Sequence, residues 1–170
     1  MKVFIGGSRK ISKLNKEIKL RIDALIAQNF IVLIGDANGV DKSIQTYLFS
    51  KNYKNVHIFC VNNLCRNNVG GWKVRNISYD SSRKDYKYYS SKDIEMAKET
   101  DYGFMIWDGE SKGTLNNIIN LIIQRKKVLV YFSPEKIFHN INNFTDLNSV
   151  FPKCHNLTSE MSSNLFSELQ

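Results

Sequence analysis

The sequence lacks any apolar run that approaches the roughly 18 residues of a membrane-spanning helix. It opens directly on a strand-like run rather than on a secretory signal pattern, so we expect a cytoplasmic protein. Cysteine is scarce as well. Cys60, Cys65 and Cys154 are too few for a disulfide framework or a zinc set, which excludes the disulfide-rich and zinc-stabilised classes.

Acidic residues are in deficit, because 24 Lys and Arg against 16 Asp and Glu give a formal net charge of +8. This excess predicts anionic partners such as a nucleotide, a phosphate or a nucleic acid. No dense basic run or aromatic RNA-binding signature accompanies it, so single-stranded DNA binding ranks third among the functions considered. The three histidines, His57, His139 and His155, show no metal-ligand spacing. No metal or cofactor is predicted.

The chain of 170 residues is long enough for one compact domain. Strand-like and helix-like stretches alternate from residue 1 to residue 132, which predicts a single Rossmann-like, doubly wound α/β domain with a mainly parallel sheet of about five strands. The expected strands are Lys2–Ile5, Phe30–Ile34, Asn55–Cys60, Asp101–Trp107 and Lys127–Phe132. The expected helices are Lys13–Gln28, Val40–Ser50, Lys92–Glu99 and Gly113–Arg125.

Two stretches depart from this alternation. Residues 61–89 are rich in Trp, Tyr and Arg and predict a long functional loop. There Arg66 and Trp72 are expected either to clamp a ligand from above or to form an oligomer interface. Residues 133–170 are polar and weakly periodic. They are expected to form a C-terminal extension of short helices, with Leu147 and Phe166 among the residues that dock on the domain or on a partner subunit.

Three glycine-centred turns each follow a strand-like run, and parallel strands would bring them to one edge of the sheet. The first, Gly6-Gly7-Ser8-Arg9, lacks the third glycine of the dinucleotide fingerprint, which argues against NAD-type binding. Its amides and hydroxyl suit a phosphate, with Arg9 as the counter-charge. A tight turn with an exposed arginine is the alternative interpretation.

The second and third turns carry the remaining candidate ligands. In the second, the candidates are Gly35, Asp36, Gly39 and Asp41, which suit ribose contacts or, equally, helix capping. In the third, the backbone and the Thr114 hydroxyl would meet an anion at a helix start. The candidates there are Asp108, Glu110, Ser111, Gly113, Thr114 and Asn117. Capping by Ser111 before a flexible turn is the alternative.

The order of these turns resembles the SLOG superfamily, the Rossmann-like group that includes the DNA-processing proteins and the lonely-guy phosphoribohydrolases. The resemblance is carried by Gly-Gly-Ser-Arg, Gly-Asp-Ala-x-Gly-Val-Asp-Lys and Gly113-Thr114, and it covers roughly residues 1–132. It implies a site for a nucleotide or nucleotide-derived ligand, in some members a signalling molecule. It also implies a homodimer or higher homo-oligomer.

One departure separates the chain from the phosphoribohydrolases, whose motif Gly-Gly-x-Gly-Thr-x-x-Glu ends in a glutamate that supports cleavage. Asn117 stands at that position here, and an amide cannot act as a general base. The first hypothesis is therefore a nucleotide-binding protein, a sensor or a signalling component. The second is an N-glycoside hydrolase or ribosyl transferase that uses another carboxylate. Its candidates are Asp108 first, then Glu110, Asp93 and Asp36.

Overall fold

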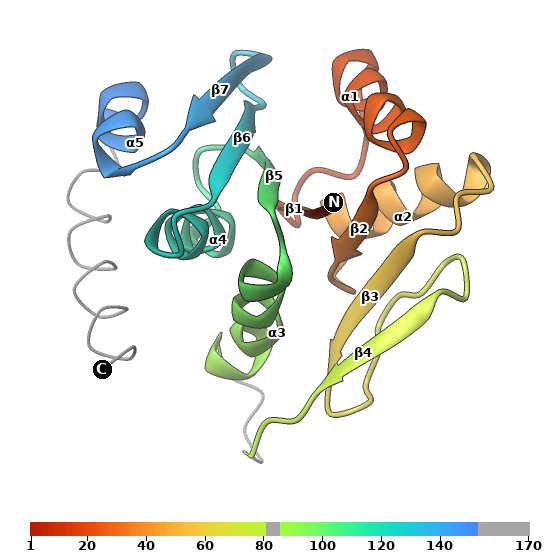
Figure 1. Cartoon of the computed structure of the whole chain (residues 1–170). Coiled ribbons are helices and arrows are strands. Elements are labelled where there is room, and N and C mark those ends of the chain that lie inside the picture. The colour runs from red at the N-terminus through yellow and green to blue at the C-terminus, as the bar shows by residue number, and fades with distance from the viewer. Residues whose placement is uncertain (81–85, 153–170) are drawn as a thin grey trace.

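The computed structural model describes residues 1–80 and 86–152, and this part of the chain forms one mixed sheet flanked by helices. Figure 1 shows the arrangement. The strands are β1 (Lys2–Gly7), β2 (Ile31–Ile34), β3 (Val56–Val61), β4 (Lys73–Ile77), β5 (Tyr102–Trp107), β6 (Lys127–Phe132) and β7 (Ile137–Ile141). The helices are α1 (Lys16–Ala27), α2 (Val40–Ser50), α3 (Tyr86–Glu99), α4 (Lys112–Ile123) and α5 (Phe144–Val150).

The strand order is β4-β3-β2-β1-β5-β6-β7, and every pairing is parallel except that of β6 with β7. From β1 the chain moves outward through β2, β3 and β4, and it then crosses back to place β5 on the other side of β1. The direction of winding therefore reverses between β1 and β5. Their register pairs Gly6 with Met105 and Gly7 with Ile106, so both strands end at the same edge.

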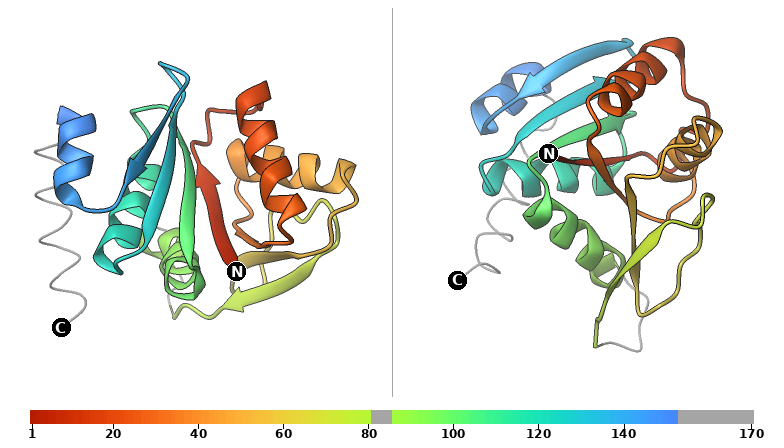
Figure 2. Two further views of the ribbon diagram at one scale, coloured as in Figure 1. Left: turned by 45° about the horizontal axis from the view of Figure 1, so that its top comes forward. Right: turned by 45° about the vertical axis from the view of Figure 1, so that its right-hand side comes forward.

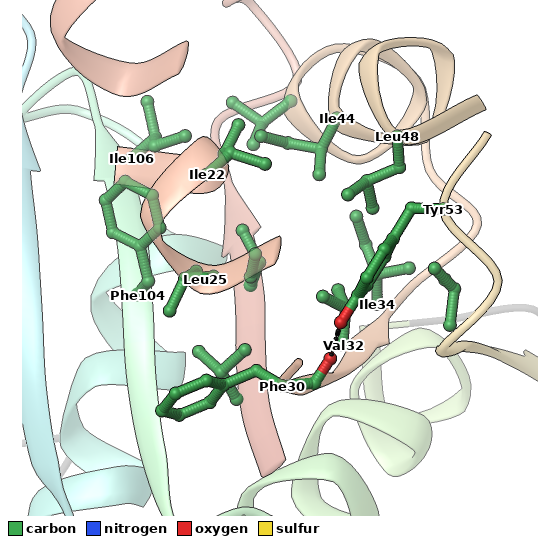
Figure 3. Close-up of a cluster of buried hydrophobic side chains, with 14 of the residues drawn as sticks. Ile22, Leu25, Phe30, Val32, Ile34, Ile44, Leu48, Tyr53, Phe104 and Ile106 are labelled. Atoms are coloured by element: carbon green, nitrogen blue, oxygen red, sulfur yellow. Dashed lines mark hydrogen bonds between the residues drawn. The ribbon is translucent and has the colours of Figure 1, made fainter. Parts of the chain in front are cut away.

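Helices cover both faces of the sheet, with α1 and α2 on one side and α3, α4 and α5 on the other (Figure 2). Strand residues alternate between the two layers, as the pleat requires. In β1, Val3 and Ile5 pack towards α1 and α2, while Phe4 packs towards α3 and α4. Figure 3 shows the first of these cores, where the hydroxyl of Tyr53 donates a hydrogen bond to the carbonyl of Phe30.

The helices begin where the sequence supplies a cap and an apolar face. Asn15 caps α1 by accepting a hydrogen bond from the amide of Ile18 at 3.1 Å. Ile18, Ile22 and Leu25 then recur at helical spacing and are all buried. In α4, Ser111 is the N-cap and nine of the twelve helical residues are buried. None of the helices in the described part of the chain is long and apolar enough to cross a membrane.

The Rossmann-like α/β fold is confirmed, with corrections to the sheet. About five strands were predicted, whereas the described residues form seven. The predicted long loop over residues 61–89 contains β4 and the first residues of α3, which begins at Tyr86 rather than at Lys92. The extension after residue 132 supplies β7 and α5. Cys154, His155 and Phe166, named in the sequence analysis, lie outside the described residues.

Cys60 and Cys65 are joined as a disulfide, with Cα atoms 5.2 Å apart, a pairing that the sequence analysis did not predict. Asn62 and Asn63 form the turn between the two cysteines. Both have positive φ angles, +49° and +59°, so the chain reverses in two residues directly after β3. The reversal places the fifth residue after Cys60 beside it. The spacing in the sequence gave no sign of such a turn.

Candidate functional site

A pocket of about 510 Å³ opens at the edge of the sheet where β1 and β5 end. This is the point at which the winding of the sheet reverses, the position where open α/β sheets bind ligands. Its walls come from the turn after β1, the start of α2, residues 89–96 of α3 and the turn that leads into α4. Phe4, Ala37 and Met96 contribute apolar side chains to the lining, beside glycines and polar residues.

The first turn is bound tightly to its neighbours. A side chain at Gly7 would place its Cβ 2.3 Å from the carbonyl oxygen of Ile106, so only glycine fits there. Ser8 is fully buried, and its hydroxyl donates a 2.5 Å hydrogen bond to Asp108. The predicted phosphate contact of the Ser8 hydroxyl therefore competes with a bond inside the protein. Arg9 lines the pocket, with its guanidinium 5.6 Å from the ring centre of Tyr89.

The second turn is shaped by groups that pack around its two glycines. Gly39 has a φ of +79°, and a Cβ there would lie 2.4 Å from the backbone of Arg9. A Cβ at Gly35 would lie 2.6 Å from Oδ2 of Asp41 and 2.7 Å from Nζ of Lys92. Both glycines thus allow the turn to lie close to its surroundings. Of the predicted residues in this turn, Asp41 lines the pocket, while Gly35 and Gly39 support the turn from behind.

Asp36 was predicted to contact ribose, but the structure pairs it with Arg66 behind the second turn. The guanidinium donates to Oδ1 at 2.7 Å and to Oδ2 at 3.1 Å, and the Arg66 amide donates to Oδ2 at 3.0 Å. Burial alone would raise the pKa of Asp36. The Arg66 hydrogen bonds and the charge of Lys92 outweigh that effect and lower it. Arg66 also lies over the ring of Tyr89, 4.8 Å from its centre.

Trp72 lies away from the pocket. Its indole is buried in the core beside α2 and donates a 2.9 Å hydrogen bond to the carbonyl of Tyr53. The glycine-rich stretch around it is shaped by the ring, because a Cβ at Gly70 would lie 2.4 Å from the indole. Trp72 therefore anchors the segment that leads into β4 and has no contact with the predicted ligand position.

A buried cluster of charges lies beneath the second turn. Nζ of Lys92 donates to Oδ1 of Asp93 at 2.7 Å and lies 4.0 Å from Oδ1 of Asp36, with only 5% of its side chain exposed. Burial alone would lower the pKa of Lys92, but the carboxylates of Asp93, Asp41 and Asp36 outweigh that effect and raise it. The ammonium thus stays charged inside the protein.

Asp41 is the carboxyl group in this cluster whose ionised form is destabilised by burial. Its side chain lies in the first turn of α2, and Oδ2 accepts a 3.2 Å hydrogen bond from the amide of Ala37. Burial raises the pKa of Asp41 to about 6. The charge of Lys92 opposes this rise, and the carboxylates of Asp93 and Asp36 add to it. A buried carboxyl on the wall of a pocket with a raised pKa is typical of a functional group.

The third turn is organised by Asp108. Oδ1 accepts hydrogen bonds from the amides of Glu110 and Ser111 at 3.0 and 2.8 Å, and Oδ2 accepts the bond from Ser8. Burial alone would raise the pKa of Asp108, but these hydrogen bonds outweigh it and lower it. Asp108 therefore lines the pocket as an ionised group that holds two turns together. Glu110 lies on the exposed rim, 2.7 Å from Nζ of Lys10.

The start of α4 presents unused polar groups to the pocket. The hydroxyl of Ser111 accepts from the amide of Thr114 at 3.4 Å, whereas the amides of Lys112 and Gly113 find no acceptor among the described residues. Asn117, one turn later, is 8% exposed and lines the pocket. In the described part of the chain its side-chain amide makes no hydrogen bond. Backbone amides at a helix start and a free amide side chain suit an anion with an adjacent hydroxyl group.

The structure thus brings most of the predicted site residues to one pocket. These are Gly6, Gly7, Ser8, Arg9, Asp41, Asp108, Glu110, Ser111, Gly113, Thr114 and Asn117. Gly35, Asp36, Gly39 and Arg66 form the supporting layer, and Trp72 lies in the core. Sequence reasoning missed Tyr89 and the buried position of Lys92. The burial of Lys92 could have been predicted from its spacing. It lies four residues after Tyr88 and four before Met96, both buried, so all three share one face of α3.

No group of His, Cys, Asp and Glu side chains within residues 1–80 and 86–152 is arranged to hold a metal ion. Comparison with protein-family models and with curated proteins finds no match to this chain. The inference of function therefore depends on the fold and on the pocket itself.

Proposed function

We propose that the chain binds a nucleotide or nucleotide-derived ligand in the pocket between β1 and β5, in the manner of a SLOG-type protein. The observation that carries this proposal is the set of unused polar groups at the start of α4. Within residues 1–80 and 86–152, the amides of Lys112 and Gly113 find no acceptor and suit a phosphate. The side-chain amide of Asn117 makes no hydrogen bond there and suits a sugar hydroxyl beside it. Arg9 also lines the pocket and adds positive charge, whereas the charge of Lys10 is paired with Glu110.

Isothermal titration calorimetry against AMP, GMP, CMP, UMP, ADP-ribose and inorganic phosphate tests this proposal. We expect a nucleotide to bind, and Asn117→Ala to weaken it by about 5- to 10-fold, the effect of one lost hydrogen bond. Asn117→Asp places a like charge beside the phosphate and should weaken binding further. Asn140→Ala, on the edge strand β7, is the matched control. The absence of binding to every compound at high micromolar concentration would refute the proposal.

A second function, cleavage of an N-glycosidic bond, is favoured by two carboxyl groups in unlike environments at the pocket wall. Asp108 is occupied by three hydrogen bonds and Glu110 lies on the exposed rim, so Asp41 and Asp93 are the carboxyl groups left for chemistry. Asp41 has the raised pKa, and Lys92 is paired with Asp93. Such a difference between two acids separates a proton donor from an anionic partner.

In this second candidate function, Asp41 would protonate the leaving base as the bond between C1′ and nitrogen breaks. Asp93 would accept a proton from the water that attacks C1′, and the products would be a free base and ribose 5-phosphate. Chromatography of the base released from nucleoside monophosphates tests it. Asp41→Asn and Asp93→Asn should each lower turnover by about 100-fold or more, whereas the control Asp23→Asn in α1 should not. Binding without any base release would leave the first function and exclude the second.

A further inference from the structure

The disulfide between Cys60 and Cys65 lies directly beside the residues that support the second turn of the pocket. Cys60 is the fifth residue of β3 and is fully buried, whereas Cys65 is exposed. Arg66 follows Cys65 immediately. Its amide and its guanidinium make three hydrogen bonds to Asp36. Because Cys65 and Arg66 are consecutive, a movement of the backbone at residue 65 also moves the Arg66 amide that donates to Asp36.

The turn that brings the two sulfurs together does not depend on the disulfide. The amide of Asn62 donates to the carbonyl of Ile77 at 3.0 Å, and its side chain exchanges two hydrogen bonds with the backbone of Tyr79, at 2.8 and 2.9 Å. The amide of Asn63 donates to the side chain of Asn76 at 2.5 Å. These contacts would keep Cys60 and Cys65 adjacent after reduction, so the bond could reform without unfolding of the domain.

The segment after Arg66 has its own anchor as well. Gln45, which is fully buried in α2, accepts a 3.0 Å hydrogen bond from the amide of Val69 and donates a 2.9 Å bond to the carbonyl of Gly35. The chain is thus fixed by hydrogen bonds on both sides of residues 65 and 66. The disulfide is the covalent restraint on this short piece, and its loss would act there rather than on the whole loop.

Exposure decides which sulfur reacts first. Cys65 can meet a dissolved oxidant, whereas Cys60 has no exposed surface and can react only with its neighbour. An exposed disulfide that closes a short ring is also open to attack by a thiol reductant. A buried and an exposed cysteine in contact thus form a pair in which one sulfur senses and the other resolves.

We propose that Cys60 and Cys65 are a reversible redox site, oxidised by a peroxide and reduced by a dithiol, whose disulfide fixes Arg66 on Asp36 and so orders the second turn of the pocket. The thiolate of Cys65 attacks hydrogen peroxide, the O–O bond breaks and a sulfenic acid forms as water leaves. The thiolate of Cys60 then attacks that sulfur, the S–O bond breaks and a second water leaves. Two thiols and one peroxide yield one disulfide and two waters.

Hydrogen exchange measured by mass spectrometry tests the coupling without any ligand. The protein carries Cys154→Ser, so that Cys60 and Cys65 are its only thiols. It is prepared oxidised with hydrogen peroxide and reduced with a dithiol, and free thiols are counted by alkylation. In the reduced form, the amides of residues 65 and 66, resolved by overlapping peptides within residues 62–70, should exchange faster. The increase should reach at most about 30-fold, the effect of releasing a six-residue ring. The peptide over β6 should not change. Cys65→Ser should reproduce the reduced behaviour under both conditions.

Calorimetry with AMP and ADP-ribose adds a second measurement, and this arm rests on the proposed nucleotide function. The reduced protein should bind more weakly, by about threefold or more, because its second turn is ordered for part of the time only. If two free thiols persist after peroxide, or if exchange over residues 62–70 is the same in both states, the redox site is refuted. If exchange changes but neither nucleotide binds in either state, the redox site stands and the nucleotide function fails.

Discussion

Asp41 gives the sharpest quantitative prediction, because its ordinary pKa of 3.8 rises to about 6 inside the fold. The folded protein therefore binds this proton more tightly than the unfolded chain does, so protonation of Asp41 stabilises the folded state. The difference is about two pH units, and at about 1.4 kcal/mol for each unit it corresponds to about 3 kcal/mol. This stabilisation is fully present below pH 3.8 and is lost as the pH rises through about 6.

The substitution that isolates this effect is Asp41→Asn, which keeps the shape of the side chain and removes its ionisation. Urea unfolding of both proteins from pH 4 to pH 8 gives two curves of unfolding free energy, and their difference cancels the other titrating groups. We expect the wild-type protein to lose about 2 kcal/mol relative to the variant between pH 4 and pH 7.5, because part of the stabilisation is already lost at pH 4. The unfolding free energy of the variant, relative to that of the wild type, should therefore be highest at high pH.

A difference curve that stays flat across this range would show that Asp41 titrates as it does in the unfolded chain. That result would refute the account in which burial dominates the neighbouring charge of Lys92. A difference with the opposite slope would mean that Lys92 overcomes the burial of Asp41. The matched control is Asp146→Asn on the surface. Hydrogen bonds from Asn142 lower the pKa of Asp146 from its ordinary 3.8, so this group titrates below the measured range and its difference curve should stay nearly flat from pH 4 to pH 8.

Three further substitutions test the supporting structure. Arg66→Ala removes the ion pair of the buried Asp36 and leaves it with Lys92 at 4.0 Å, so the unfolding free energy should fall by about 3 kcal/mol. The control Arg75→Ala removes an exposed pair with Glu99 and should cost less than about 1 kcal/mol. Gly35→Ala forces a Cβ against Asp41 and Lys92 and should cost about 1–3 kcal/mol, whereas Gly113→Ala meets nothing within 4 Å and should be neutral or stabilising in thermal unfolding. Trp72→Phe leaves the carbonyl of Tyr53 without its donor and should cost about 1–3 kcal/mol in urea unfolding, with nucleotide affinity unchanged. Equal losses within either matched pair, or a loss of affinity in Trp72→Phe, would contradict the contacts described above.

The central strands were predictable from the sequence because they are continuous apolar runs. The two edge strands were missed because they lack such runs. β4 has the sequence Lys-Val-Arg-Asn-Ile and is mostly exposed, so no buried face marks it. β7 follows a turn and pairs on one side only, as the antiparallel neighbour of β6. Edge strands carry polar residues that resist further pairing, and their pattern resembles that of a loop.

The positions of the three turns were predictable, but the use of their side chains was not. Parallel strands bring their carboxyl ends together whatever the loops contain. Whether a carboxylate remains free for a ligand depends on partners that are remote in sequence. Ser8 and Asp108 are 100 residues apart, and Asp36 and Arg66 are 30 residues apart. Local sequence patterns carry no information on such pairs, so each of these carboxylates looked equally available.

Hydrogen bonds join the three turns of the pocket to one another. Ser8 joins the first turn to the third through Asp108, and its carbonyl accepts a 3.1 Å bond from the amide of Val40 in the second. A polar group that makes such a hydrogen bond within the protein is not available to bind a ligand. Among the described residues, the polar groups left for a ligand at the wall include the start of α4, Asn117 and the carboxyl groups of Asp41 and Asp93. A ligand that binds there meets a site already in place, so ordering the pocket costs it little affinity. Substitutions that break the joining bonds should then weaken binding by loosening the site, even though they touch no ligand atom.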